Sequence, residues 1–234
     1  MPAVILAGGL ATRLGRLTRD MPKAMVEVAG RPFLWHQLHL LKQNGVRRVV
    51  LLVGHLGEMI QRYFEDGTAL GVSLQYSFDG PKLLGTAGAI RKALPLLPEQ
   101  FFVLYGDSYL PCNYAHVEAA FRQSRAPAMM VIYRNEGRFD KSNVEFDGTR
   151  ILLYDKIEVH ERLHYIDYGL GAFHRDVFSN LADGTVCDLA SVYRDHVQSG
   201  QLAAYEVHER FYEIGSPTGL RETTAHLESI SEAL

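Results

Sequence analysis

Cysteine is scarce in this chain, whose 234 residues include only Cys112 and Cys187. Two widely separated cysteines are too few for a disulfide framework or a cysteine-rich zinc site. We therefore expect both as reduced thiols, which is usual in the cytosol. Among the ten histidines, His160 and His164 lie four residues apart, but their surroundings are polar and carry no helix-start signal. No metal site is expected there.

An excess of positive charge is also missing. Lysine and arginine number 24 against 27 aspartates and glutamates, which gives a net charge of −3. This balance excludes a surface-wide basic field of the kind that binds nucleic acid. No apolar run approaches the roughly 18 residues that span a bilayer. Because Met1–Leu6 also lacks the charged leader of a signal peptide, we expect a cytoplasmic protein with neither nucleic acid nor membrane as a partner.

Hydrophobic residues make up 47% of the chain, enough for a sizeable core, and they gather in short runs. In the first half these runs alternate with amphipathic stretches. Strands are expected at Ala3–Leu6, Val49–Val53, Val72–Tyr76, Phe101–Tyr105 and Met129–Tyr133. Helices are expected at His55–Phe64, Thr86–Leu94 and Tyr114–Ser124, and from Pro32, where Phe33, Leu34, Gln37, Leu38 and Leu41 follow at helical spacing. Because the strands are apolar throughout, we expect an α/β fold with a mostly parallel sheet flanked by helices.

The alternation of apolar runs with amphipathic stretches ends after about residue 140. Asn143–Phe146 and Ile151–Tyr154 flank Asp147-Gly148, a hairpin signal. Further short strands at Ile166–Phe173, Ala203–Val207 and Phe211–Ile214 and a closing helix at Pro217–Ile230 are expected. Since there is no linker or repeat, we expect one domain over 1–234, with a core over 1–135 and a smaller α+β annex over 136–234.

A glycine-rich loop follows the first expected strand. It begins Leu6-Ala7-Gly8-Gly9, and Arg13 and Lys23 come shortly after. Paired glycines let backbone N–H groups approach a polyphosphate, and the two cations supply opposite charge. Neither a Walker A loop nor the dinucleotide fingerprint matches these residues. Taken alone, the glycine pair favours a simple glycine turn beside a solvated arginine and lysine.

Two more segments lie where ligands bind in such sheets, near the carboxyl ends of strands. Leu84-Gly85-Thr86-Ala87-Gly88 opens an expected helix, which Thr86 can cap, and its small residues would let a flat base or a sugar lie close to the backbone. Gly106-Asp107 ends an apolar strand. A carboxylate there could hold Mg²⁺, or simply cap the next helix.

Together these motifs resemble the sugar-phosphate nucleotidylyltransferases, also called nucleotide-sugar pyrophosphorylases. The family pattern Leu-Ala-Gly-Gly, Thr-Arg-Leu, Pro-Lys and Gly-Arg-Pro occurs here in order between Leu6 and Pro32, with Ala11 where many relatives have a glycine. The resemblance implies a Rossmann-like nucleotide-diphospho-sugar transferase fold. It also implies that nucleotide is bound by Leu6, Ala7, Gly8, Gly9, Arg13, Lys23, Gly85, Thr86, Gly88 and Asp107, of which Arg13, Lys23 and Asp107 are catalytic.

A second ligand for Mg²⁺ is implied near the end of the chain. Relatives carry an Asp-Ile/Thr-Gly-Thr/Ser-Pro segment there, and this chain has Glu213-Ile214-Gly215-Ser216-Pro217. We expect Glu213 to ligate the ion with Asp107, either directly or through water. The alternative is a strand-end glutamate that precedes a helix start at Pro217.

The resemblance also implies residues for the acceptor, a sugar 1-phosphate. Asp155-Lys156 resembles the family's Glu-Lys pair, whose lysine binds the sugar phosphate. Asp167 and Gly169 replace residues of an Asn-Ala-Gly segment that holds sugar hydroxyls, so the usual hexose contacts do not transfer directly. Asn143 is a further candidate for the sugar. The alternatives are a solvated lysine on a hairpin for Lys156 and a strand-end acid hydrogen-bonded to loop amides for Asp167.

The implied reaction joins a nucleoside triphosphate to a sugar 1-phosphate and releases pyrophosphate. GTP and a heptose- or mannose-type acceptor are favoured, and a homodimer is plausible from family habit. Two alternatives stay open. One is a cytidylyltransferase for a non-sugar phosphate such as phosphocholine, caged by Tyr154, Tyr165 and Tyr168. The other is a non-catalytic nucleotide-sugar-binding regulatory protein, although such proteins tend to lose the lysine and the metal carboxylates.

Overall fold

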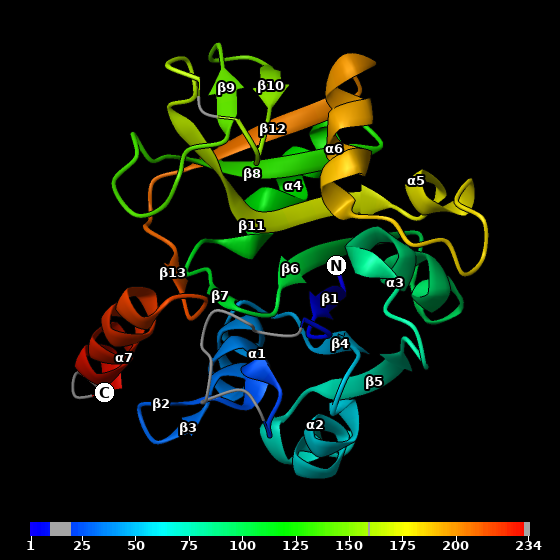
Figure 1. Ribbon diagram of the computed structural model, residues 1–234, viewed down its shortest axis with the longest axis vertical. Coiled ribbons are helices and arrows are strands. Elements are labelled where there is room, and N and C mark those ends of the chain that lie inside the picture. The colour runs from blue at the N-terminus through cyan, green and yellow to red at the C-terminus, as the bar shows by residue number, and fades with distance from the viewer. Residues whose placement is uncertain (10–19, 159, 232–234) are drawn as a thin grey trace. The chain divides into compact units, whose positions relative to one another are not determined.

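The computed structural model describes residues 1–9, 20–158 and 160–231 (Figure 1). They form two units, neither of them a continuous stretch of chain. Unit 1 comprises Met1, Leu84–Val103 and Cys112–Arg210, and unit 2 comprises Pro2–Leu83, Leu104–Pro111 and the segment from Phe211 onward. Strand β6 (Gln100–Tyr105) runs from the first into the second. The division of one domain into a core over 1–135 and an annex over 136–234 stays a prediction.

Unit 2 is built on three parallel strands, β1 (Ala3–Leu6), β4 (Arg48–Val53) and β5 (Ser73–Phe78). The first three residues of β1 are fully buried, as expected for a parallel strand covered on both faces. The helices α1 (Phe33–Gln43) and α2 (Gly57–Phe64) connect these strands (Figure 1). Pro32 is not the first helical residue that we predicted, because it pairs with Glu27 in the short hairpin of β2 (Glu27–Val28) and β3 (Arg31–Pro32).

A two-stranded ladder completes unit 2. Strand β7 (Ser108–Tyr109) pairs antiparallel with β13 (Tyr212–Glu213), and helix α7 (Pro217–Ser231) follows directly. Their apolar residues Tyr109, Ile214 and Leu227 pack with Val28 and Phe33 in one buried cluster. The ladder therefore joins the segment after β6 to the last part of the chain.

Unit 1 is mostly antiparallel. Strand β11 (Tyr165–His174) pairs antiparallel with β8 (Ala128–Arg134) and with β9 (Val144–Phe146), and β12 (Leu202–Val207) pairs parallel with β8. The predicted hairpin is present as β9 and β10 (Ile151–Tyr154). The helices of this unit are α3 (Gly85–Ala93), α4 (Tyr114–Ser124), α5 (Asp176–Ser179) and α6 (Leu189–Gln198). Among the described residues of both units, 3₁₀ turns lie at η2 (Lys23–Met25), η3 (Thr68–Leu70) and η4 (Leu94–Leu96). In the part of the chain that the structure describes, no helix has the length and apolarity needed to cross a membrane.

The two cysteines differ in their surroundings. Cys112 is 5% exposed, and burial, with a contribution from the charge of Glu209, raises the pKa of its thiol to about 12. Cys187 is half-buried. Because the thiolate is the reactive form, we expect iodoacetamide at pH 8 to modify Cys187 first and Cys112 only after unfolding. Peptide mapping by mass spectrometry before and after denaturation tests this, and equal labelling of both in the native protein would contradict it.

Candidate functional site

The ends of β1 and β6 meet at the carboxyl edge of the unit 2 sheet. The Gly106 N–H donates to the Leu6 carbonyl at 3.1 Å, and the Ala7 N–H donates to the Leu52 carbonyl at 2.8 Å. A Cβ at Gly106 would lie 2.5 Å from the Leu6 oxygen and 3.1 Å from the Ala7 Cα. Only glycine fits this approach, which brings the start of the glycine-rich loop beside Asp107.

The replacement Gly106→Ala should therefore lower both stability and activity. The atoms that crowd the new methyl belong to the backbone and cannot move aside as a flexible side chain could. Overpacking of this kind costs about 1–3 kcal/mol of unfolding free energy. We expect a lower midpoint of thermal unfolding together with reduced pyrophosphate release. An unchanged midpoint would show that the two strand ends are less tightly packed than described.

The first residues of the loop approach the end of β4. A Cβ on Gly8 would lie 3.1 Å from the Gly54 nitrogen, whereas the space around the Cβ position of Gly9 is open to 4 Å within the described part of the chain. Gly8 is therefore fixed by packing, and Gly9 leaves its backbone accessible. Arg13, the catalytic arginine implied by the resemblance, lies outside the described residues.

Lys23 and Asp107 form an ion pair. The Lys23 Nζ lies 2.7 Å from Asp107 Oδ2, and their side chains are 14% and 34% exposed. Lys23 begins the turn η2, and Asp107 lies between β6 and β7, so the pair joins residues far apart in the sequence. The structure thus brings the predicted lysine and aspartate together, with the ammonium shielded and the carboxylate reachable from solvent.

Glu213 is placed beside Asp107 by the β7–β13 ladder. Glu213 is in register with Ser108, and the Ile214 N–H donates to the Asp107 carbonyl at 2.9 Å. The Glu213 carboxylate accepts hydrogen bonds from the Gly215 N–H and from the N–H (3.1 Å) and hydroxyl (2.6 Å) of Ser216. These donors lie just before α7, where a carboxylate is favoured by the unpaired N–H groups of a helix start.

All three charged groups converge on Gly215, on the side where any other residue would carry its Cβ. A Cβ there would lie 2.7 Å from Glu213 Oε2, 3.0 Å from Lys23 Nζ and 3.6 Å from Asp107 Oδ2. Two carboxylates facing one small space form the hard-oxygen donor set that suits Mg²⁺, which usually takes one or two carboxylates along with phosphate oxygens. The donor types therefore suit that ion, which would share the Glu213 carboxylate with the three hydrogen bonds that it accepts from Gly215 and Ser216.

The candidate acceptor residues gather in unit 1. The Asp167 side chain is 2% exposed, and its oxygens accept from the Gly169 N–H at 3.0 Å and the Tyr154 hydroxyl at 3.0 Å. Lys156 Nζ lies 3.6 Å from Asp167 Oδ2 and is 37% exposed. Asn143 accepts the Asp167 N–H at 2.8 Å. The structure thus brings Asn143, Lys156, Asp167 and Gly169 together, with the lysine as the solvent-facing member.

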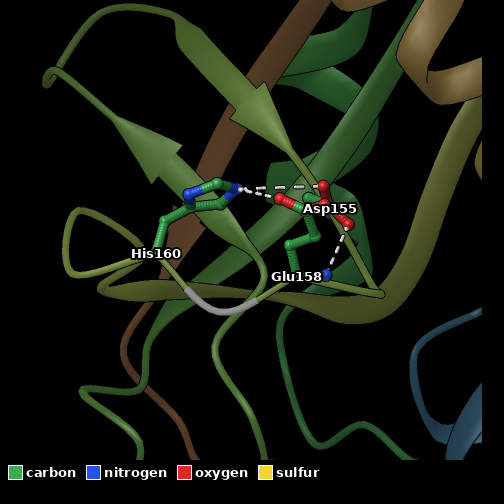
Figure 2. Close-up of side chains that lie close together, drawn as sticks. All are labelled: Asp155, Glu158 and His160. Carbon is green, nitrogen blue, oxygen red and sulfur yellow. Dashed lines mark hydrogen bonds and ion pairs between the residues drawn. The ribbon is translucent and has the colours of Figure 1, made fainter.

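Asp155 stabilises a turn next to this group. Its Oδ1 accepts the N–H groups of Ile157 and Glu158 at 2.7 and 3.1 Å, and these bonds hold the pKa of Asp155 below its usual value. His160 Nε2 lies 3.9 Å from Asp155 and 3.6 Å from Glu158 (Figure 2). Aspartate commonly holds turns in this way. The trio is an acidic turn in which Glu158 is exposed and Asp155 and His160 are half-buried, and acidic groups of this kind are common without a bound ion.

The glycines of Leu84–Gly88 serve close packing within unit 1. Gly85 has φ +71°, and a Cβ there would lie 2.5 Å from the Cys187 oxygen, while one on Gly88 would overlap the Thr185 oxygen. Thr86 does not cap the helix as predicted: α3 starts at Gly85, and the Thr86 hydroxyl accepts the Leu189 N–H at 2.6 Å. Residues 185–189 therefore pack against much of the Leu84–Gly88 segment, a contact that the sequence pattern did not predict.

Comparisons with known proteins identify the family of the chain. A family model described as Nucleotidyl transferase matches residues 2–229. The chain is 28% identical over 217 residues to the D-glycero-alpha-D-manno-heptose 1-phosphate guanylyltransferase of Campylobacter jejuni, covering 93% of this chain and 96% of that one. It is 31% identical over 229 residues to the N-acetylmuramate alpha-1-phosphate uridylyltransferase of Neisseria meningitidis, covering 96% and 97%.

Among solved structures, a Bacillus anthracis protein named as a candidate glucose-1-phosphate thymidylyltransferase has a TM-score of 0.85 at 20% identity. The alignment covers 97% of this chain and 94% of that one. At that identity the likeness concerns the fold. It confirms the predicted class, a mostly parallel sheet flanked by helices.

Proposed function

This chain belongs to the nucleotidyl transferase family, as a sugar-phosphate nucleotidylyltransferase, and we propose that Lys23, Asp107 and Glu213 are the centre of its reaction. A phosphate oxygen of the sugar 1-phosphate forms a bond to the α-phosphorus of the nucleoside triphosphate. The bond from that phosphorus to the bridging oxygen breaks, and pyrophosphate leaves. The acceptor phosphate is already an anion, so no general base is required.

The observation that carries this proposal is the convergence of the three charged groups at Gly215. Asp107 and Glu213 are the residues that would hold Mg²⁺. When bound, the ion supplies positive charge against the oxygens of the transferred phosphate. Lys23, oriented by its 2.7 Å pair with Asp107, donates hydrogen bonds to phosphate oxygens as negative charge shifts toward pyrophosphate. The work of these residues is positioning and charge neutralisation.

Lys156 is our candidate for the phosphate of the acceptor. Its ammonium is held by buried Asp167 yet keeps 37% of its side chain exposed. Both carboxylate oxygens of Asp167 accept hydrogen bonds from protein groups. This supports a role for Asp167 in orienting Lys156, in addition to any contact that Asp167 makes with the sugar. The phosphocholine alternative loses support here, because Tyr154 and Tyr168 are 2% and 1% exposed and do not form an open aromatic cage.

For the nucleotide we propose GTP, and for the acceptor a heptose- or mannose-type 1-phosphate. The full-length similarity to the Campylobacter guanylyltransferase supports this choice. The Neisseria relative, a uridylyltransferase covered to the same extent, makes UTP the competitor.

Pyrophosphate release tests the assignment. GTP, UTP, CTP, dTTP and ATP would each be combined with mannose, glucose and heptose 1-phosphates and with phosphocholine, with and without Mg²⁺. We expect release that depends on Mg²⁺ and is fastest with GTP and a mannose- or heptose-type acceptor. Release with another pair would replace the proposed substrates, and no release with any pair would favour a nucleotide-sugar-binding protein.

A further inference from the structure

Two polar side chains of α1 are buried: His36, whose Nε2 lies 2.7 Å from the Val28 carbonyl oxygen, and Gln37. Gln37 is 2% exposed and lies among Phe33, Leu34, Leu38 and Leu41, all of which are fully buried. Burying an amide destabilises a protein unless the amide is hydrogen-bonded. The partners of Gln37 are therefore informative.

The Gln37 side-chain nitrogen donates two hydrogen bonds into the segment that carries Asp107. It lies 3.0 Å from the Tyr105 carbonyl oxygen and 2.8 Å from the Ser108 carbonyl oxygen. Because both partners can only accept, the nitrogen and not the oxygen of the amide must face them. One side chain thus ties together the two residues that flank Gly106-Asp107.

We propose that Gln37 is a positioning residue, which fixes the Tyr105–Ser108 turn so that the Asp107 carboxylate faces Lys23 and Glu213. The inference rests on the proposed function only for the role of Asp107 in the reaction. The turn is also held by two backbone contacts, from the Gly106 N–H to Leu6 and from the Ile214 N–H to the Asp107 carbonyl. Gln37 supplies a side-chain contact from a third element, α1, which can be removed without altering the main chain.

The unused half of the amide supports this reading. Gln37 Oε1 is buried and has no hydrogen-bond partner within the described part of the chain. A buried acceptor without a partner destabilises the fold, so an apolar residue of equal length would satisfy packing alone at least as well. What the glutamine adds is the pair of N–H donors to the Asp107 turn.

The test uses Gln37→Met, which keeps the length of the side chain and removes both donors. The control is Gln43→Met on the last turn of the same helix, where the side chain is exposed. Hydrogen exchange followed by mass spectrometry, without substrates, compares peptides covering 104–110 and 211–216 with one covering β4. Losing two hydrogen bonds should speed exchange in the first two peptides by about tenfold or more and leave β4 unchanged.

The second readout is the Mg²⁺ concentration that gives half-maximal pyrophosphate release. We expect Gln37→Met to raise it about tenfold, with the KM for the acceptor unchanged, while Gln43→Met matches the wild type in both measurements. Unchanged exchange at 104–110 would overturn the proposal, as would faster exchange spread over all of unit 2. If Gln37→Met does not fold, Gln37→Asn, too short to reach both carbonyls, receives the same measurements. A wild type without activity would refute the proposed function but leave the exchange result to decide the positioning role.

Discussion

Asp107→Asn is expected to lower turnover at least about a hundredfold, because loss of one preorganised charge contact raises the barrier by about 3 kcal/mol. The amide keeps the shape of the side chain but lacks the negative charge that pairs with Lys23 at 2.7 Å and would hold Mg²⁺. The fold should survive, since the Asp107 side chain is 34% exposed and ion pairs of this kind stabilise weakly. Steady-state pyrophosphate release and thermal unfolding measure the two effects.

Glu58→Gln is the matched control, because it removes one negative charge from an exposed position on α2 in the same unit. Its turnover should equal that of the wild type. Lys23→Ala should be as slow as Asp107→Asn, and the double variant should be much less impaired than the product of the two effects, since the residues act as one unit. Near-normal turnover in either single variant would refute the proposed centre.

Gly215→Ala is expected to reduce turnover by a similar factor for a different reason. The new methyl would lie 2.7 Å from Glu213 Oε2 and 3.0 Å from Lys23 Nζ, inside the space that the charged groups share. Lys23 ends a flexible side chain, but turning the Glu213 carboxylate away breaks the hydrogen bonds that it accepts from Gly215 and Ser216 at the start of α7. We therefore expect turnover to fall about a hundredfold, together with a loss of about 1–3 kcal/mol of unfolding free energy.

Thr218→Ala, an exposed change three residues later, controls for disturbance of the start of α7. It should leave turnover unchanged. Gly106→Ala offers a further comparison, because its methyl meets backbone atoms and should lower stability as well as activity. Full activity of Gly215→Ala would mean that the space beside this residue is not where the substrates react.

Buried, periodic elements were predictable from the sequence. The predicted β1 and α4 have the observed bounds, because an unbroken apolar run marks the first, and Asn113, whose side chain accepts the His116 N–H, caps the second. Strand β7 was not predictable, since two residues show no period and their partner, β13, is distant in the sequence. Helix α6 was also not placed, although Asp188 caps its start by accepting the Ala190 N–H.

For the site, motif spacing supplied the charged residues and the structure supplied their surroundings. Lys23, Asp107 and Glu213 were named from short motifs, and the structure brings them together at Gly215. The helical spacing predicted that Gln37 is buried. It could not predict that the amide donates to the carbonyls of Tyr105 and Ser108, which are distant in the sequence. The capping role predicted for Thr86 was wrong because its hydroxyl meets the N–H of Leu189, which lies about a hundred residues later in the sequence.

The order in which unit 2 is assembled has a consequence for synthesis. Its parallel strands and Lys23 come from the first third of the chain, while Glu213 and α7 come from its last part. Asp107 is therefore synthesised long before β13, the strand that pairs with β7. Until Glu213 has been synthesised, the nascent chain carries only Asp107 of the two carboxylates that meet at Gly215. If Asp107 and Glu213 hold Mg²⁺ as we propose, shortened products that end before β13 lack this acid pair and are expected to be inactive.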